Sequence, residues 1–224
     1  MTKIKKPKAI LFDWDNTLVN TFPIIYQGLH DAFTAMGMEP WTFEDIMRNR
    51  DGIHQSLKQS FPRIFGERWE EAREAYYKSF LANHLEKMQV LDGAVDTLHE
   101  LSKKDIYVAI VSNKTGKYLR TEVDFLGWQN YFDKIVGAYD AENDKPHADP
   151  VHLALNGSGI AADENVMFIG DSSTDVECAL NAGVTPVIFG DHIFDQGVAH
   201  LEVDLRTLKQ VKNHKELLEI VRGF

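Results

Sequence analysis

The feature that most constrains the fold is a regular alternation of short apolar runs with helix-like stretches from about residue 90 onward. Four runs have the composition of buried strands, and they are I-Y-V-A-I-V (106–111), K-I-V-G-A (134–138), V-M-F-I-G (166–170) and V-T-P-V-I-F (184–189). K-A-I-L-F, near the N-terminus, is a fifth run of this kind. Strands that are buried on both faces are nearly continuous in apolar residues, which is typical of parallel sheets.

Helical patterns lie between these runs. They cover residues 93–101, 115–126, 149–155 and 175–183. Strands that alternate with helices indicate a parallel sheet with helices on both faces. We therefore predict an α/β fold with a Rossmann-like core.

Residues 20 to about 88 interrupt the alternation, and nothing there resembles a buried strand. Apolar residues recur instead at helical spacing, as in Leu29, Phe33 and Met36. We predict three or four helices, inserted directly after the first strand. The chain then divides into an α/β core, residues 1–19 and 89–224, and a small helical cap domain, residues 20–88.

Composition excludes some partners. The chain of 224 residues carries a formal net charge of -10, which argues against nucleic acid, because phosphate backbones are bound through clustered Lys and Arg. No apolar run approaches the length of a membrane span, so we expect no membrane partner. One cysteine, Cys178, forms no internal disulfide, and with no secretory signal in the sequence we expect a cytoplasmic protein, either a monomer or a homodimer.

Polar side chains follow the predicted strands. Asp13, Asp15 and Thr17 come after the first strand and Ser112 and Asn113 after the second; Lys145 follows the third, and Asp171 and Asp175 follow the fourth. Ligands of open α/β sheets bind outside the carboxyl ends of the strands, so we expect these side chains to form one site.

The composition of this site points to phosphoryl chemistry. Acids without a converging His or Cys favour Mg²⁺ over Zn²⁺. A divalent ion beside a lysine, hydroxyls and backbone N–H groups is a receptor for a phosphoryl group. One carboxylate can then attack phosphorus to form an aspartyl-phosphate, while another exchanges protons with the leaving alcohol and the attacking water.

These motifs, D-W-D-N-T (13–17), a strand ending in Ser112, Lys145-Pro146 and G-D-S-S-T-D (170–175), together resemble the haloacid dehalogenase-like superfamily. The resemblance covers essentially the whole chain and is closest to phosphoglycolate phosphatase-like members with a helical cap after the first motif. It implies Asp13 as the nucleophile and Asp15 as the acid/base, with the main-chain carbonyl of Asp15 also binding Mg²⁺.

The resemblance assigns the remaining motif residues as well. It implies that Ser112 and Lys145 bind the phosphoryl oxygens, that Asp171 is a metal ligand and that Asp175 orients the metal site. We expect Thr17 and Asn113 to add to substrate binding. Asn16 stands where the family often has Gly, and Asn is the residue that best tolerates a positive φ after Gly.

The insert is expected to set specificity by closing over the site. Its candidate contacts are Arg48, Arg50, His54 and Arg63. An arginine there could pair with a second anionic group on the substrate, and a solvated helix end is the alternative. A related branch of the superfamily hydrolyses phosphonates through a Schiff base on a lysine of the cap. Lys58 is the only lysine in the middle of the insert, and we interpret it as a solvated surface lysine instead.

Two other functions stay open. A phosphomutase resembles this chain equally well in the core. A non-enzymatic phospho-acceptor module, such as a response-regulator receiver, also gathers acids, a hydroxyl and a lysine near Mg²⁺, but it needs neither the insert nor Asp15. We therefore predict a Mg²⁺-dependent phosphatase of a small phosphorylated metabolite, such as a phosphoglycolate-like, sugar or nucleotide phosphate.

Overall fold

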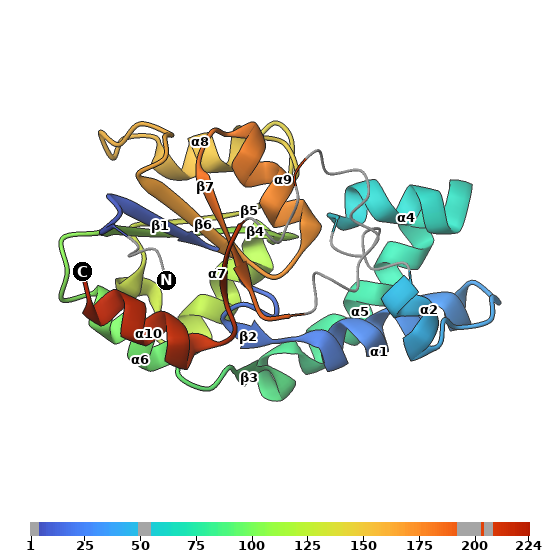
Figure 1. Ribbon diagram of the computed structural model, residues 1–224. Helices are drawn as coiled ribbons and strands as arrows, with labels where there is room; N and C mark the ends of the chain where they lie inside the picture. The colour runs from blue at the N-terminus through green and yellow to red at the C-terminus, as the bar shows by residue number, and fades with distance from the viewer. Residues whose placement is uncertain (1–4, 49–54, 192–202, 204–207) are drawn as a thin grey trace.

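Six parallel strands form the central sheet of the computed structural model, which describes residues 5–48, 55–191, 203 and 208–224 (Figure 1). The strands are β1 (Ala9–Phe12), β4 (Tyr107–Thr115), β5 (Lys134–Ala138), β6 (Val166–Gly170), β7 (Thr185–Phe189) and β8 (Lys209–Val211). Their order across the sheet is β5-β4-β1-β6-β7-β8. The central strand β1 lies between β4 and β6, so the carboxyl ends of these three strands are neighbours.

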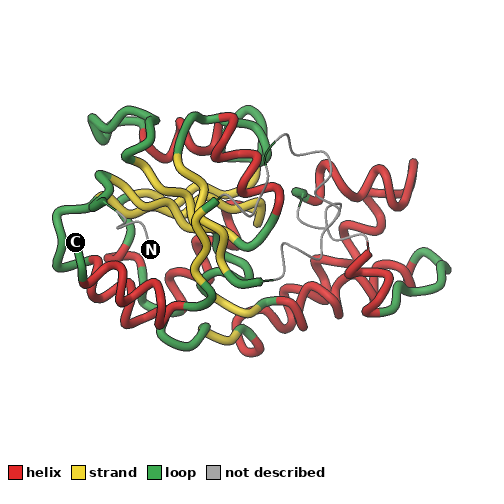
Figure 2. The backbone as a smooth tube through the Cα atoms, in the orientation of Figure 1, coloured by secondary structure: helices red, strands yellow, loops and turns green. Residues whose placement is uncertain are grey.

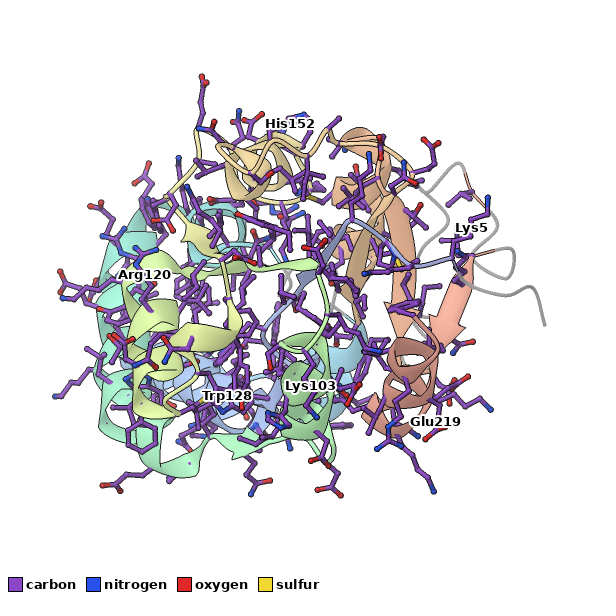
Figure 3. All side chains as sticks on the ribbon, turned by 90° about the vertical axis from the view of Figure 1, so that its left-hand side faces the viewer. Lys5, Lys103, Arg120, Trp128, His152 and Glu219 are labelled. Carbon is purple, nitrogen blue, oxygen red and sulfur yellow. The ribbon has the colours of Figure 1, made fainter. Side chains whose placement is uncertain are left out.

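Helices cover both faces of the sheet. One face packs against α6 (Ala94–Leu101), α7 (Gly116–Phe125) and α10 (His214–Arg222), and the other packs against α8 (Asp149–Leu155) and α9 (Ser173–Asn181). Figure 3 shows the two layers from the side: His152 of α8 lies at the top, and Glu219 of α10 lies at the bottom. The predicted α/β, Rossmann-like fold is confirmed.

The sequence of β1 explains why both faces are covered. Ile10 and Phe12 belong to the core under α6, α7 and α10, while Ala9 and Leu11 belong to the core under α8 and α9. All four side chains are essentially inaccessible to solvent. Successive side chains of a strand point to opposite faces, so a strand that is apolar throughout must be buried twice. Burial of a side chain the size of Ile or Phe stabilises the fold by about 1.5–3 kcal/mol.

The described part of the insert is helical. It contains α1 (Phe22–Ala35), α2 (Phe43–Arg48), α4 (Leu57–Phe65), a 3₁₀ turn η1 (Gly66–Arg68) and α5 (Trp69–Lys87). These helices lie beside the sheet in Figure 2, where they form an area without strands. They share their own apolar core, which includes Leu29, Phe33, Phe61 and Tyr76.

A short antiparallel pair joins the insert to the sheet. It is formed by β2 (Val19–Asn20) and β3 (Gln89–Val90), with Val19 opposite Val90. This pair was not predicted, because two residues are too few for a strand pattern to register. The proposed boundaries of the two domains, 20 and 88, fall close to it. None of the described helices combines the length and apolar character that crossing a membrane requires.

Candidate active site

Lys145 lies between two carboxylates at the carboxyl ends of β1 and β6. Its Nζ donates to Asp13 Oδ1 at 2.8 Å, to Asp175 Oδ1 at 2.6 Å and to the Val111 carbonyl at 3.0 Å. The side chain is only 3% exposed. An ammonium group buried in this way needs compensating charges, and here it has two of them. Lys145 therefore links the end of β1, through Asp13, to the first turn of α9 after β6, through Asp175.

Asn113 fixes the backbone of Lys145. Its Oδ1 accepts from the Lys145 N–H at 3.0 Å, and its Nδ2 donates to the Lys145 carbonyl at 3.0 Å. Asn113 also lines the cavity described below. Asn113, which was predicted to bind substrate, therefore holds the backbone of Lys145 in place.

Three buried acids converge beside Lys145. Asp13, Asp171 and Asp175 each offer a carboxylate oxygen, and these oxygens lie within 4.8 Å of one another. Carboxylate oxygens at this separation suit a hard divalent cation. The cluster therefore fits the ion that the sequence predicts, although Asp175 already uses both of its oxygens.

Asp175 is held from two sides. Its Oδ1 accepts from Lys145, and its Oδ2 accepts from the N–H and the hydroxyl of Ser172 at 3.0 and 2.6 Å. Ser172 and Asp175 form the capping box that begins α9. Gly170 leaves room for this arrangement, since a Cβ there would lie 2.4 Å from Asp175 Cγ. Asp175 is thus better suited to orienting the cluster than to binding an ion directly.

Burial dominates the ionisation of Asp13. Desolvation raises the pKa of Asp13 to about 7, with Lys145 opposing this shift and the charges of Asp175 and Asp15 adding to it. Three buried acids, Asp13, Asp171 and Asp175, lie beside a single ammonium group, that of Lys145, so negative charge is in excess there. A bound cation would relieve that excess, so the electrostatics agree with the donor set.

Asp15 and Asp13 lie on the same side of the chain, and Trp14 points the other way. Trp14 is fully buried in the core and packs edge-on against Trp128, while both acids line the cavity. This is the alternation expected of a strand that continues past its last ladder residue. Asn16 then turns the chain with a φ of 59°, in the left-handed region that its residue type tolerates.

The carboxylate of Asp15 is held by two donors. Thr21 Oγ1 donates to Asp15 Oδ1 at 2.5 Å, and Lys114 Nζ donates to the same oxygen at 2.7 Å. Thr21 immediately precedes α1 of the insert, and Lys114 lies near the end of β4. Asp15 is therefore tied both to the sheet and to the start of the insert.

A cavity joins the strand ends to the insert. Its base is formed by residues of the core, namely Asp13, Asp15, Asn16, Ser112, Asn113, Lys114, Thr115, Tyr118, Lys145 and Ser172. Its described wall on the insert side is mostly apolar and aromatic, and includes Phe22, Ile25, Leu57, Phe61, Tyr76 and Tyr77. Tyr77 is also hydrogen bonded through its hydroxyl to Thr115 Oγ1 at 2.6 Å, so the insert contacts the core beside the site.

Some predicted residues lie elsewhere. The side chain of Thr17 is fully buried and is not part of the cavity lining; its main-chain carbonyl instead pairs with His214. Arg48 ends α2, but its side chain, like Arg50 and His54, lies outside the described residues. Arg63 is exposed on α4, where it donates to Gln55, a residue of the cavity wall.

A buried ion pair lies beside Asp15 and was not predicted from the sequence. Lys114 Nζ donates to Glu122 Oε2 at 2.7 Å as well as to Asp15, and Glu122 is completely buried on α7. The signal in the sequence was an acid on the helix face that also carries Leu119 and Val123. Burial would raise the pKa of Glu122, but Lys114 and neighbouring hydrogen bonds outweigh it and the pKa is lowered.

Comparison with known proteins agrees with this geometry. The family model described as haloacid dehalogenase-like hydrolase matches residues 10–199. A protein named pyrophosphatase PpaX from Halalkalibacterium halodurans is 31% identical over 182 residues, which cover 81% of this chain and 83% of the relative. A protein named phosphoglycolate phosphatase from Pectobacterium atrosepticum is 27% identical, with 84% and 82% covered.

A solved structure gives the same result at the level of the fold. The crystal structure of a HAD-superfamily hydrolase from Ehrlichia chaffeensis has 30% sequence identity and a TM-score of 0.67, and the match covers 98% of each chain. The family model spans most of the chain and includes the ends of β1, β4 and β6. The chain belongs to the haloacid dehalogenase-like hydrolases.

Proposed function

We propose that this protein is a Mg²⁺-dependent phosphatase that hydrolyses a small phosphate monoester through an aspartyl-phosphate on Asp13. The observation that carries the proposal is Lys145, which bridges Asp13 and Asp175 at the base of the cavity. Asp171 is buried in the same acid cluster as Asp13 and Asp175, and Ser112, which is also buried, lines the cavity together with Asp13 and Lys145. The relatives named as phosphatases support the same reaction class.

Each residue has a role that its position supports. The Asp13 carboxylate attacks phosphorus, and Lys145 and Ser112 bind the phosphoryl oxygens, whose negative charge they stabilise. Asp15 donates a proton to the leaving oxygen and afterwards removes one from the water that cleaves the aspartyl-phosphate. Asp13 and Asp171, with the main-chain carbonyl of Asp15, would hold Mg²⁺, which supplies positive charge next to the phosphoryl group.

The helical insert, residues 20–88, is proposed to act as a cap over the strand ends that hold Asp13, Asp15 and Lys145. Its described wall faces the strand-end residues across the shared cavity. Closure over a phosphate ester would exclude water, which otherwise competes for the phosphoryl group. Arg48 and Arg50 stay predicted contacts for a second anionic group on the substrate.

The first experiment measures phosphate release from p-nitrophenyl phosphate, with Mg²⁺ and after removal of metal with EDTA. Activity should depend on Mg²⁺, and Asp13→Asn should lose at least about 10³-fold in kcat, because the nucleophile is gone. Asp124→Asn is the matched control, since Asp124 is an exposed acid on α7. Full activity in EDTA would remove the metal from the proposal, and activity retained by Asp13→Asn would remove the nucleophile.

The same assay separates the phosphatase from the two alternatives. A phosphatase releases many phosphates per chain, whereas a phospho-acceptor module releases about one before it needs a new donor. A phosphomutase would convert a sugar phosphate to its isomer and would depend on a bisphosphate primer. Asp15 favours an enzyme, because an acid placed beside the nucleophile serves leaving-group protonation.

A further inference from the structure

A buried chain of charges connects the proposed acid/base to the buried face of helix α7. Lys114 Nζ lies 2.7 Å from Asp15 Oδ1 and 2.7 Å from Glu122 Oε2. The Lys114 side chain is 6% exposed and that of Glu122 is 0% exposed. The order in space is thus carboxylate, ammonium, carboxylate, with the ammonium group in the middle.

Glu122 is itself held by two more donors. Trp14 Nε1 donates to its Oε2 at 2.6 Å, and His84 Nδ1 lies 3.0 Å from its Oε1. A carboxylate only accepts hydrogen bonds, so the hydrogen in the second contact is on Nδ1 of His84. Trp14 belongs to the motif of the nucleophile, and His84 belongs to helix α5 of the insert.

A gain in folding stability does not explain the buried Lys114–Glu122 pair. Burial of an ammonium group and a carboxylate costs several kcal/mol per ion, which their attraction only partly offsets, and apolar residues of similar volume often serve as well. The surroundings are already apolar, since Glu122 shares its helix face with Leu119 and Val123. What the charges add is a fixed position for Lys114.

That position has a consequence for Asp15. The Lys114 and Thr21 hydrogen bonds both fall on Oδ1. Within the described residues, this leaves Oδ2 as the oxygen of Asp15 that can exchange a proton with a substrate. Loss of Lys114 would leave the carboxylate with one donor and free to rotate away from the leaving group.

We propose that Lys114 and Glu122 are positioning residues for Asp15, and that His84 ties their position to helix α5 of the insert. The proposal rests on the proposed function, because it requires Asp15 to act as the acid/base. It adds that the acid is correctly placed only while a buried lysine, its partner carboxylate and a histidine of the insert are all in contact.

The leaving group of the substrate provides a specific readout. Glycerol 2-phosphate has an alkoxide leaving group that needs a proton, whereas 2,4-dinitrophenyl phosphate has a stable anionic leaving group that departs without one. The ratio of kcat/KM for these two esters reports on the general acid, because kcat/KM covers the steps up to departure of the leaving group. A merely structural defect would lower both values together.

The experiment compares Lys114→Met with Lys117→Met, a matched control at an exposed lysine three residues further on, in the first turn of α7. Lys114→Met should lower kcat/KM for glycerol 2-phosphate by about 10–100-fold and that for 2,4-dinitrophenyl phosphate by less than about 3-fold. In an Asp15→Asn background the same substitution should add less than about 3-fold, because the group that it positions is already gone. Equal losses on both esters, or full additivity with Asp15→Asn, would overturn the proposal.

Two further variants keep the test valid if Lys114→Met folds poorly. The double variant Lys114→Met with Glu122→Gln removes both buried charges, and circular dichroism and Tm check that it is folded. It should change the ratio of kcat/KM for the two esters as Lys114→Met does. A wild-type ratio in the double variant would contradict the proposal. In the wild type the His84 ring lies 4.5 Å from that of Phe80. His84→Phe keeps an aromatic ring at this position but removes the hydrogen-bond donor, and it should change the ratio of kcat/KM for the two esters in the same direction by a smaller factor. An unchanged ratio in His84→Phe would remove the insert from the proposal.

Failure of the proposed function would look different. In that case the wild-type protein would turn over neither ester, or Asp13→Asn would remain active. Failure of the positioning proposal requires an active wild type that loses activity in Asp13→Asn, together with Lys114 variants whose losses are independent of the leaving group.

Discussion

His214 and Thr17 are 197 positions apart in the chain, yet the ring Nε2 of His214 lies 2.7 Å from the main-chain oxygen of Thr17. His214 is fully buried at the start of α10, with its ring 4.8 Å from that of Phe189. Burial lowers the pKa of His214 to about 4, so at neutral pH the ring is uncharged and Nε2–H donates to the carbonyl. The C-terminal helix thus supports the loop that carries Asp13 and Asp15.

This contact predicts acid sensitivity. The folded-state pKa of His214 is about 4 and its ordinary value is 6.5, so its contribution to stability is complete above about pH 6.5 and is lost as the pH falls toward 4. The full loss is about 3 kcal/mol in the free energy of unfolding. Urea unfolding at a series of pH values measures it. His214→Phe should flatten this part of the profile, whereas His152→Gln, at an exposed position, should not; an unchanged profile in His214→Phe would contradict the assignment.

A second prediction concerns metal binding and pH. Without metal, the raised pKa of Asp13, about 7, means that the folded state prefers the protonated acid; this contribution to stability is full below the ordinary value of 3.8 and is lost as the pH rises through 7. Mg²⁺ competes with that proton. The increase in Tm caused by Mg²⁺ should therefore be larger at about pH 7.5 than at about pH 5.5. Asp13→Asn should lose this dependence, and a Tm shift independent of pH in the wild type would argue against Asp13 as a ligand.

A third prediction separates the two halves of the reaction. Asp15→Asn keeps the shape of the side chain but cannot exchange the proton, so turnover should fall by roughly 10²–10⁴-fold. With an ester whose leaving group departs unprotonated, the aspartyl-phosphate should accumulate, and mass spectrometry of acid-quenched protein should detect one added phosphoryl group. A wild-type rate, or failure to detect the adduct at any time point, would leave Asp15 without the proposed role.

A fourth prediction tests the packing around Asp175. A methyl group at position 170 would lie 2.4–2.5 Å from Asp175 atoms, so Gly170→Ala must displace that side chain from Lys145 or from the N-terminus of α9. Overpacking of this kind costs about 1–3 kcal/mol, and we expect a lower Tm together with a reduced kcat. Thermal unfolding and phosphate release measure the two effects. A fully active and equally stable Gly170→Ala would show that Asp175 does not need its observed position.

The sequence predicted those strands whose own residues show a continuous apolar pattern. The runs at 134–138 and 166–170 coincide with β5 and β6, because strands buried on both faces leave an apolar record at every position. β8 escaped prediction: it is an edge strand of three residues, and its pattern is half exposed. The strand ends with acids were visible for the same reason, since a charge directly after a buried run is conspicuous.

Contacts between distant elements could not be predicted in this way. His84 and Glu122 lie on different helices, and no spacing rule connects them. Thr17 shows a different limit. The alternation that places Asp13 and Asp15 together holds only while the chain is extended, and the positive φ of Asn16 ends it, so Thr17 is turned into the protein and away from the cavity.

The β2–β3 pair brings together the two points at which the chain passes between the core and the insert. The chain leaves the core at Asn20 and returns at Gln89, and these two residues face each other across the pair. Paired strands lie about 4.8 Å apart, so to the sheet the whole insert is equivalent to one long hairpin loop. Another set of helices whose ends meet at this distance could be grafted in its place without a change in the strand ends that hold Asp13, Lys145 and Asp171, which would allow one catalytic core to be paired with many substrates.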